Sequence, residues 1–542
     1  GFSVLIAGVS IYQFINKSGE SFFNRSVYLG EVFLLGSILV VGELLILSLV
    51  GLYKAPYLWG CVGLNYLFLL HRETRETMVM NFSTRKVFSF PALIFLALLS
   101  VFAFRNYYFL VTGDSHNVYL FAQKLWLMKG TSILGDTGFN IAIFTPHFNA
   151  VPYSLGLSLF GQEVLFPQLI NISWHIVALL LVFGYTSYRF NGYYGLMAAV
   201  LVLFDEHFFF SGINACVIIN GAVIAFLFAS VYNFWESRSK NCSFRFLLAL
   251  IFLSQLMGNK YQMVYVTVLM AMTGLLIQPA VLQTLKRLFV DKRSAGVLAA
   301  AVCVTGLWYI KNFLATGCPT YPILADKFGV FNWTPEMVHN FSKVFGGVSI
   351  GKFLKYLTYF YVWPGVVPAK LLALIMIALP FVLLIAAFRN RIENSSVQEL
   401  SFWLGVSLLG MAGVCFVCYT DPRIYRYLIA VWAFASVFAI EYILRNCFGF
   451  KKTFVLGLGS VILFFLFLGA GIVSKKVIPC KTPTIRENVD VFLNRLHMDD
   501  AILRYYPKNI AALKGFNENK EKAMRAAWDI GRGGSNSLSA FL

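Results

Sequence analysis

Three short stretches of the chain place carboxylates at the outer ends of long apolar runs or in the loop between two of them. Asp114 lies in Gly-Asp-Ser, Asp136 in Gly-Asp-Thr-Gly, and Asp205 is followed by Glu206. An ionisable side chain at membrane depth costs about 2.5–3.5 kcal/mol on insertion scales, so its presence calls for a compensating role. A carboxylate within hydrogen-bond reach of an acceptor hydroxyl can act as a general base. The alternative is that such a carboxylate marks the end of a membrane helix.

Four cations occupy similar positions between or beside apolar runs. They are Lys260, Lys311, Arg423 and Arg426. An anionic ligand such as a lipid phosphate would compensate for their placement. Two alternatives are that these side chains extend to the lipid headgroups, as Lys311 could do, and that Arg426 forms an internal ion pair with Asp421 or Glu206.

Further polar candidates for ligand contact are His116, Tyr119 and His147. The chain has only 7 His and no His-x-x-x-His or His-x-His pair, so we expect no dedicated metal site, although a divalent cation stays an open alternative. A P-loop and a Gly-x-Gly-x-x-Gly fingerprint are both missing from the sequence. No seat for nucleotide chemistry is therefore predicted.

Composition indicates the class of protein that must position these residues. Of 542 residues, 58% are hydrophobic and 13% charged, against roughly 45–50% and 25% in soluble proteins. The composition predicts a polytopic membrane protein. The formal charge of +19 does not indicate nucleic acid binding, because the basic residues gather in short loops between apolar runs. The 9 cysteines are scattered and predict neither a disulfide framework nor a zinc site.

About 14 apolar runs are long enough, or nearly long enough, to span a bilayer. They cover residues 2–15, 28–52, 55–70, 87–104, 165–187, 193–209, 212–234, 246–258, 261–277, 295–311, 369–388, 400–419, 427–446 and 454–473. Six connecting loops are rich in Arg and Lys, among them the loop with Arg238, Lys240 and Arg245, and are expected on the cytoplasmic side. Alternation then places all the candidate residues above on the opposite, outer face.

Two long outer loops, 105–164 and 312–368, are too polar to span the membrane. Each contains a candidate short amphipathic helix, at 124–128 and at 334–339. We expect three units: extra N-terminal transmembrane helices over 1–86, a transmembrane core over 87–473, and a soluble C-terminal tail over 474–542 on the outer face.

Four stretches resemble motifs of the GT-C superfamily of polytopic glycosyltransferases, which use polyprenyl-phosphate sugars on the outer or lumenal side of a membrane. They are 113–119 with 125–130 (an acid with a tyrosine), 145–149 with 153–161 (Pro and aromatics), 307–312 with 316–322 (Trp-Tyr-Ile-Lys-Asn, then Gly-Cys-Pro-Thr-Tyr-Pro), and Arg426-Tyr427-Leu428. The third is the most specific. Within the superfamily the chain resembles the bacterial mannosyltransferases and aminoarabinose transferases.

This resemblance implies an all-α, polytopic transmembrane helical bundle of GT-C type with about 13–14 spans and outer-face loops that carry short amphipathic helices. Asp114 would be the catalytic base, and Lys260 and Arg426 would hold the donor phosphate. One departure is that the segment 213–220 offers only Asn220 where many members carry a second acid. Either Asp205 and Glu206 substitute for it, or the second acidic role and any metal requirement are absent.

The sequence thus predicts an inverting membrane glycosyltransferase whose donor is a polyprenyl-phosphate-linked sugar. The donor-phosphate ligands are expected to be Lys260, Arg426, Lys311 and Arg423, and the acceptor or sugar contacts His116, Tyr119, Asp136, His147, Asp205 and Glu206. The expected location is a bacterial inner membrane with the C-terminus in the periplasm. The alternatives are a non-catalytic subunit, docked through the N-terminal spans or the tail, and a transporter of lipid-linked glycans.

Overall fold

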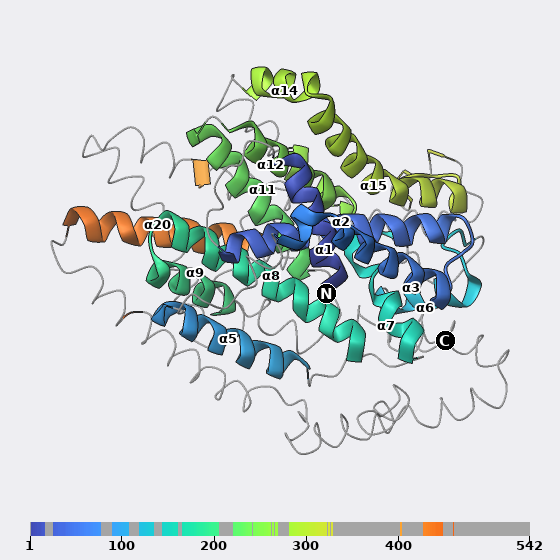
Figure 1. The fold of residues 1–542 in the computed structure, drawn as a ribbon, viewed down its shortest axis with the longest axis horizontal. Helices are drawn as coiled ribbons and strands as arrows, with labels where there is room; N and C mark the ends of the chain where they lie inside the picture. The colour runs from blue at the N-terminus through green and yellow to red at the C-terminus, as the bar shows by residue number, and fades with distance from the viewer. Residues whose placement is uncertain are drawn as a thin grey trace, which may run out of the picture.

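The computed structural model describes about the first two thirds of the chain, with gaps, and one late helix. The described residues are 2–16, 25–76, 89–107, 119–134, 144–160, 165–204, 220–240, 242–261, 263–264, 266–268, 281–321, 324–325, 327–328, 402–403, 427–447 and 459. Within these ranges the regular structure is entirely helical and contains no strand, which confirms the expected all-α class (Figure 1).

The helices run in the order α1 (Phe2–Ile15), α2 (Arg25–Leu49), α3 (Ala55–Leu64), η1 (Asn65–Leu70), α5 (Phe90–Tyr107), α6 (Phe121–Lys129), η4 (Phe148–Ala150), α7 (Tyr153–Phe160), α8 (Leu165–Arg189), α9 (Gly192–Phe204), α11 (Asn220–Lys240), α12 (Ser243–Met257), α14 (Val281–Val290), α15 (Lys292–Thr316) and α20 (Ile429–Cys447). Here η denotes a 3₁₀ helix.

Three of these helices are long and apolar enough to cross a membrane. They cover Ser26–Leu49, Phe166–Arg189 and Lys292–Thr316 and have 24, 24 and 25 residues. At 1.5 Å per residue each exceeds the roughly 30 Å of a hydrocarbon core. Shorter apolar helices surround them, so the chain is an integral membrane protein with a polytopic helical bundle.

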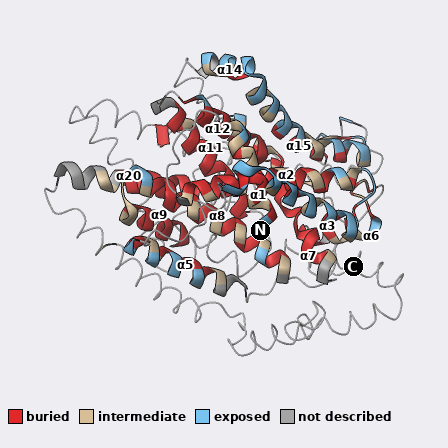
Figure 2. Ribbon diagram, viewed as in Figure 1, coloured by how far each residue is buried: buried red, intermediate tan, exposed pale blue. Residues whose placement is uncertain are grey.

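The bundle core lies where α8, α9, α11 and α12 meet, and Figure 2 shows these helices as mostly buried. Helix α15 exposes much more of its surface, including Val302, Ile310 and Phe313. These exposed side chains are apolar, as expected of a helix that faces lipid along one side.

Helices α1 and α2 cross at two glycines. A Cβ added to Gly8 would lie 1.8 Å from the carbonyl oxygen of Val32, and one added to Gly36 would lie 1.8 Å from that of Val4. The two backbones are therefore closer than any side chain would allow, which is the usual way in which membrane helices gain packing contacts without a hydrophobic driving force. The pair then packs against the rest of the bundle through α2, which contacts α8 and α15.

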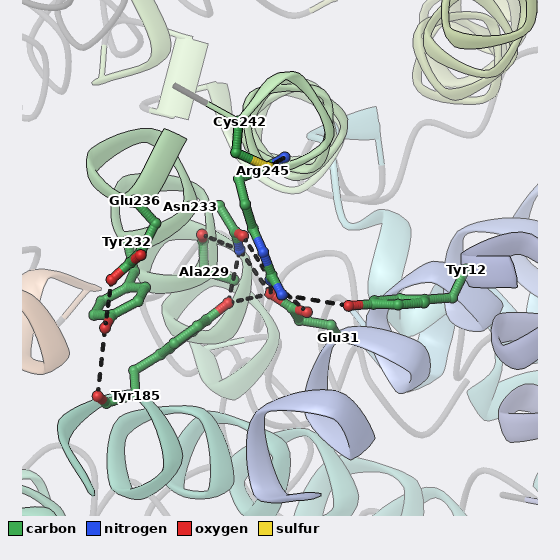
Figure 3. A network of polar contacts seen from close by, with 9 residues as sticks. All are labelled: Tyr12, Glu31, Tyr185, Ala229, Tyr232, Asn233, Glu236, Cys242 and Arg245. Carbon is green, nitrogen blue, oxygen red and sulfur yellow. Dashed lines mark hydrogen bonds and ion pairs between the residues drawn. The ribbon is translucent and has the colours of Figure 1, made fainter. Parts of the chain in front are cut away.

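A buried polar network joins the N-terminal helices to the bundle (Figure 3). Nη1 of Arg245 on α12 donates to both carboxylate oxygens of Glu31 on α2, at 2.8 and 2.9 Å, and the side chains of the pair are 3% and 0% exposed. Tyr185 on α8 and Asn233 on α11 also donate to Glu31. Nη2 of Arg245 reaches the hydroxyl of Tyr12 on α1 at 3.4 Å.

The expectation that Arg245 lies in a basic loop was wrong, because this residue belongs to the first turn of α12 and is buried. Its charge is balanced by a carboxylate 214 positions away in the chain. Five helices, α1, α2, α8, α11 and α12, contribute to the network, so it fixes the register of the N-terminal pair against the bundle.

Candidate functional site

Lys311 is buried on the inward face of α15. It is 1% exposed, and its neighbours on that face, Trp308 and Asn312, are 0% exposed, whereas Ile310 and Phe313 on the other face are half exposed. The spacing of three and four residues places Trp308, Lys311 and Asn312 together on one side of the helix. This side chain does not extend to the headgroups, so the alternative of a lysine that reaches out to the lipid surface is wrong.

Three aromatic rings surround the ammonium of Lys311. Its Nζ lies 3.7 Å from the ring centroid of Trp308, 5.0 Å from that of Trp126 and 5.5 Å from that of Phe144. Within the part of the chain that the structure describes, Nζ has no hydrogen-bond acceptor and no carboxylate partner. We call Lys311 and these three rings the lysine box.

The carbonyl of Phe144 fixes the first outer segment to α15. It accepts hydrogen bonds from Nε1 of Trp308 at 3.2 Å and from Nδ2 of Asn312 at 3.0 Å. Asn312 also contacts the hydroxyl of Tyr261 at 3.2 Å, and that hydroxyl donates to the carbonyl of Tyr321 at 2.5 Å. Segments that lie more than 160 positions apart in the chain are thus joined at one point of the box.

A pair of asparagines joins the same segment to the end of α12. Oδ1 of Asn259 accepts from the backbone N–H of Asn149 at 3.1 Å and from its Nδ2 at 2.9 Å. One residue further along, Lys260 places its Nζ 5.2 Å from the ring centroid of Tyr427, which directly follows Arg426 in the sequence. The asparagine pair therefore positions Lys260 beside the start of α20.

The loop between α2 and α3 holds α6, the helix that supplies Trp126. The hydroxyl of Tyr53 donates to Oε1 of Gln123 at 2.7 Å, and the Tyr53 ring contacts Trp126 edge to face at 5.7 Å. The hydroxyls of Ser48 and Ser132 are 2.7 Å apart, and Gly130 ends α6 with φ of 74°, in the left-handed region that glycine adopts without strain. The N-terminal helices thus position one wall of the lysine box.

His147 lies next to the box and is 1% exposed. Its ring is 4.5 Å from that of Trp308 and 5.7 Å from that of Tyr119, centroid to centroid. Burial, followed by the nearby charge of Lys311, lowers the pKa of His147 well below its usual value of 6.5. The imidazole is therefore neutral at physiological pH.

The structure brings together four of the predicted site residues: Tyr119, His147, Lys260 and Lys311. The other predicted residues, Asp114, His116, Asp136, Asp205, Glu206, Arg423 and Arg426, lie outside the described residues, as does the expected short helix at 334–339. The short helix expected at 124–128 is present as α6. Among the described residues no group of three metal-ligating side chains comes together.

Sequence reasoning missed the residues that shape the box rather than carry charge. Trp126 and Phe144 form its walls, and Asn149, Asn259 and Tyr53 hold those walls in place. The expected helix around Trp126 signalled a membrane surface, since its apolar residues suit lipid contact. The sequence contains one signal that this helix lies inside the protein, namely the aromatic residues in the segments before and after it.

No protein-family model matches the chain, and no curated protein matches it in sequence. Among solved structures, ArnT from Cupriavidus metallidurans, crystallised with undecaprenyl phosphate bound, is similar with a TM-score of 0.48 and 11% identity, over 83% of this chain and 73% of that one.

Proposed function

We propose that the chain is a membrane glycosyltransferase that takes its sugar from a polyprenyl-phosphate donor, and that the lysine box holds the donor phosphate. The observation that carries the proposal is Lys311, a residue that is 1% exposed and whose ammonium has no anionic partner among the described residues. Cation–π contacts contribute about 2 kcal/mol at desolvated sites, less than the several kcal/mol that burial of an unpaired charge costs. A phosphate oxygen would supply the missing partner.

The box also suits the rest of such a donor. Indole and phenyl rings offer flat apolar faces beside the cation. The opposite face of α15 is exposed and apolar, so it suits contact with lipid hydrocarbon, including a polyprenyl chain. Lys260 stands beside Tyr427, so we propose that Lys260, with Arg423 and Arg426, forms a second cationic contact for the same phosphate.

In the proposed reaction Asp114 accepts a proton from a hydroxyl or amine of the acceptor. The acceptor atom forms a bond to the anomeric carbon while the bond from that carbon to the phosphate oxygen breaks, and its electron pair stays on the phosphate. Inversion follows from a single displacement. Lys311 stabilises the negative charge that develops on the leaving phosphate, which is where an enzyme gains the most from a fixed cation.

The remaining roles are also proposals. His116, Tyr119, Asp136, His147, Asp205 and Glu206 contact the sugar or the acceptor, and the protein resides in a bacterial inner membrane with its site and C-terminus on the periplasmic side. Charge placement supports this orientation, because basic loops are retained on the cytoplasmic side.

The test combines binding with transfer. Purified protein in lipid nanodiscs should bind undecaprenyl phosphate, and Lys311→Met should weaken binding about 10- to 100-fold, the loss expected for a hydrogen bond to a charged group. Lys292→Met, at the exposed start of the same helix, is the matched control and should bind normally. Asp114→Asn should retain binding but lose transfer from a panel of labelled polyprenyl-phosphate sugars.

Two other results of these binding and transfer assays would contradict the proposal. Binding without transfer in the wild-type protein, for every sugar and acceptor offered, would favour a non-catalytic subunit or a lipid-linked glycan transporter. Equal affinity in the wild-type protein and Lys311→Met would show that the phosphate does not lie in the lysine box.

A further inference from the structure

His147 is held in one tautomer. Its Nδ1 lies 2.7 Å from the carbonyl oxygen of Thr145, and a carbonyl can only accept a hydrogen bond. Nδ1 therefore carries the proton, and Nε2 carries a lone pair because the ring is neutral. The ring thus presents a hydrogen-bond acceptor on its free side.

That acceptor has no partner within the described part of the chain. Nε2 of His147 is fully buried and makes no hydrogen bond there. A buried polar atom without a partner costs about 1–3 kcal/mol, so folding would not favour this arrangement unless something else occupied the position. Such an atom beside a candidate site is available to accept a hydrogen bond from a bound ligand.

The neighbourhood of Nε2 restricts the chemistry of that contact. The rings of His147 and Trp308 are 4.5 Å apart, and Nζ of Lys311 lies 3.7 Å from the centroid of the same Trp308 ring. A ligand in this corner meets a cation and a neutral acceptor together. An anionic oxygen can bind to Lys311, but the lone pair on Nε2 of His147 would repel it. The ligand group at His147 must therefore be a hydrogen-bond donor.

We infer that Nε2 of His147 accepts a hydrogen bond from a hydroxyl of the bound ligand, next to the anionic oxygen held by Lys311; this inference rests on the proposed function. Two parts of a polyprenyl-phosphate donor present this pair of groups. One is a protonated phosphate monoester, with P–OH beside P–O⁻, and the other is a ring hydroxyl of a sugar attached to the phosphate.

The experiment compares three kinds of probe at pH 6, near the second pKa of a phosphate monoester. Undecaprenyl phosphate carries a P–OH, its methyl ester carries no hydroxyl, and a panel of undecaprenyl phosphoryl hexoses carries only sugar hydroxyls. Affinities are measured in nanodiscs for the wild-type protein, His147→Phe, which keeps a ring, and His147→Gln, which keeps an acceptor. His71→Phe, at an exposed position, is the control for loss of a histidine.

We expect His147→Phe to lose about three- to tenfold in affinity for the hydroxyl-bearing probes and nothing for the methyl ester, which is the change expected for one neutral hydrogen bond. His147→Gln should recover part of the loss. Selective loss for undecaprenyl phosphate would identify P–OH as the donor, and selective loss for phosphoryl hexoses would identify a sugar hydroxyl. The same change for every probe, methyl ester included, or no change at all, would overturn the inference.

Failure of the inference is distinct from failure of the proposed function. If Lys311→Met loses binding while His147→Phe affects all probes equally, only the inference about His147 is overturned. If the wild-type protein binds none of the probes, the proposed function fails, and the inference fails with it.

Discussion

Replacing Glu31 by glutamine should destabilise the protein far more than the loss of an exposed ion pair. Both partners of the Glu31–Arg245 pair are buried, with side chains 0% and 3% exposed. In Glu31→Gln the guanidinium loses its anion, and one carboxylate oxygen becomes an amide that donates instead of accepting. Removing one partner of a buried pair costs about 3–5 kcal/mol, because the remaining charge stays buried.

The chain offers a matched control. Arg72 and Glu76 form an ion pair at 2.6 Å on an exposed helical turn, with side chains 82% and 57% exposed. Pairs of this kind contribute about 0.3–0.5 kcal/mol, so Glu76→Gln should change stability by no more than this. The two variants remove the same charge by the same substitution and differ in burial.

Equilibrium unfolding in mixed detergent micelles gives the free energy of unfolding for each variant. A double variant that combines Glu31→Gln with Arg245→Met should recover part of the loss, because no unpaired charge is then buried. If Glu31→Gln and Glu76→Gln lower the free energy of unfolding equally, the argument from burial is refuted.

Three further predictions concern packing and the site. Gly36→Ala should destabilise the crossing of α1 and α2 by about 1–3 kcal/mol in the same unfolding assay. Gly306→Ala on α15, where a Cβ would meet nothing within 4 Å, should not destabilise the protein. Equal effects of the two substitutions would contradict the close crossing. Asn312→Leu removes one of the two donors to the carbonyl of Phe144 and should cost about 0.5–1.5 kcal/mol, and an unchanged free energy of unfolding would refute this role. Burial lowers the pKa of His147, so the imidazole binds a proton more readily in the unfolded chain than in the folded one. The free energy of unfolding is therefore retained above about pH 6.5 and falls as the pH drops below that value. His147→Phe should reduce this fall, and identical pH profiles of the variant and the wild-type protein would contradict the prediction.

Much of the helical framework is predictable from the sequence, because uninterrupted apolar runs have few alternatives in a bilayer. The runs expected at 28–52, 165–187 and 295–311 correspond to α2, α8 and α15. The run expected at 55–70 differs in detail: its helix α3 ends at Leu64, and a 3₁₀ segment, η1, continues to Leu70. Asn65, at that change, donates to the Cys61 carbonyl and to the Glu43 carboxylate.

Part of the site is also predictable. Lys260, Lys311 and His147 are conspicuous as polar residues beside apolar runs, and the structure places them near one another. Which partners a polar residue finds across the chain is not predictable from local pattern. Glu31 falls inside the apolar run expected at 28–52 and Arg245 in an expected basic loop, and only the packing of five helices makes them a pair.

The walls of the lysine box are likewise not predictable from local sequence pattern. Trp126 belongs to a short amphipathic helix, a pattern shared by segments that lie on a membrane surface. Its position against Lys311 depends on Ser48, in the last turn of α2, and on Tyr53, in the loop that follows, both more than 70 positions earlier in the chain than Trp126. Long-range contacts of this kind leave no periodic pattern in the sequence. The charged and polar residues of the site are therefore easier to predict from the sequence than the arrangement of the residues around them.

A cryo-electron microscopy structure of the protein in nanodiscs with undecaprenyl phosphate would show where the lipid phosphate binds. We expect a phosphate oxygen within about 3 Å of Nζ of Lys311, the distance of a charge-assisted hydrogen bond, with the rings of Trp126, Trp308 and Phe144 around the ammonium. A lipid phosphate bound at another place, with Lys311 still enclosed by the three rings alone, would contradict it.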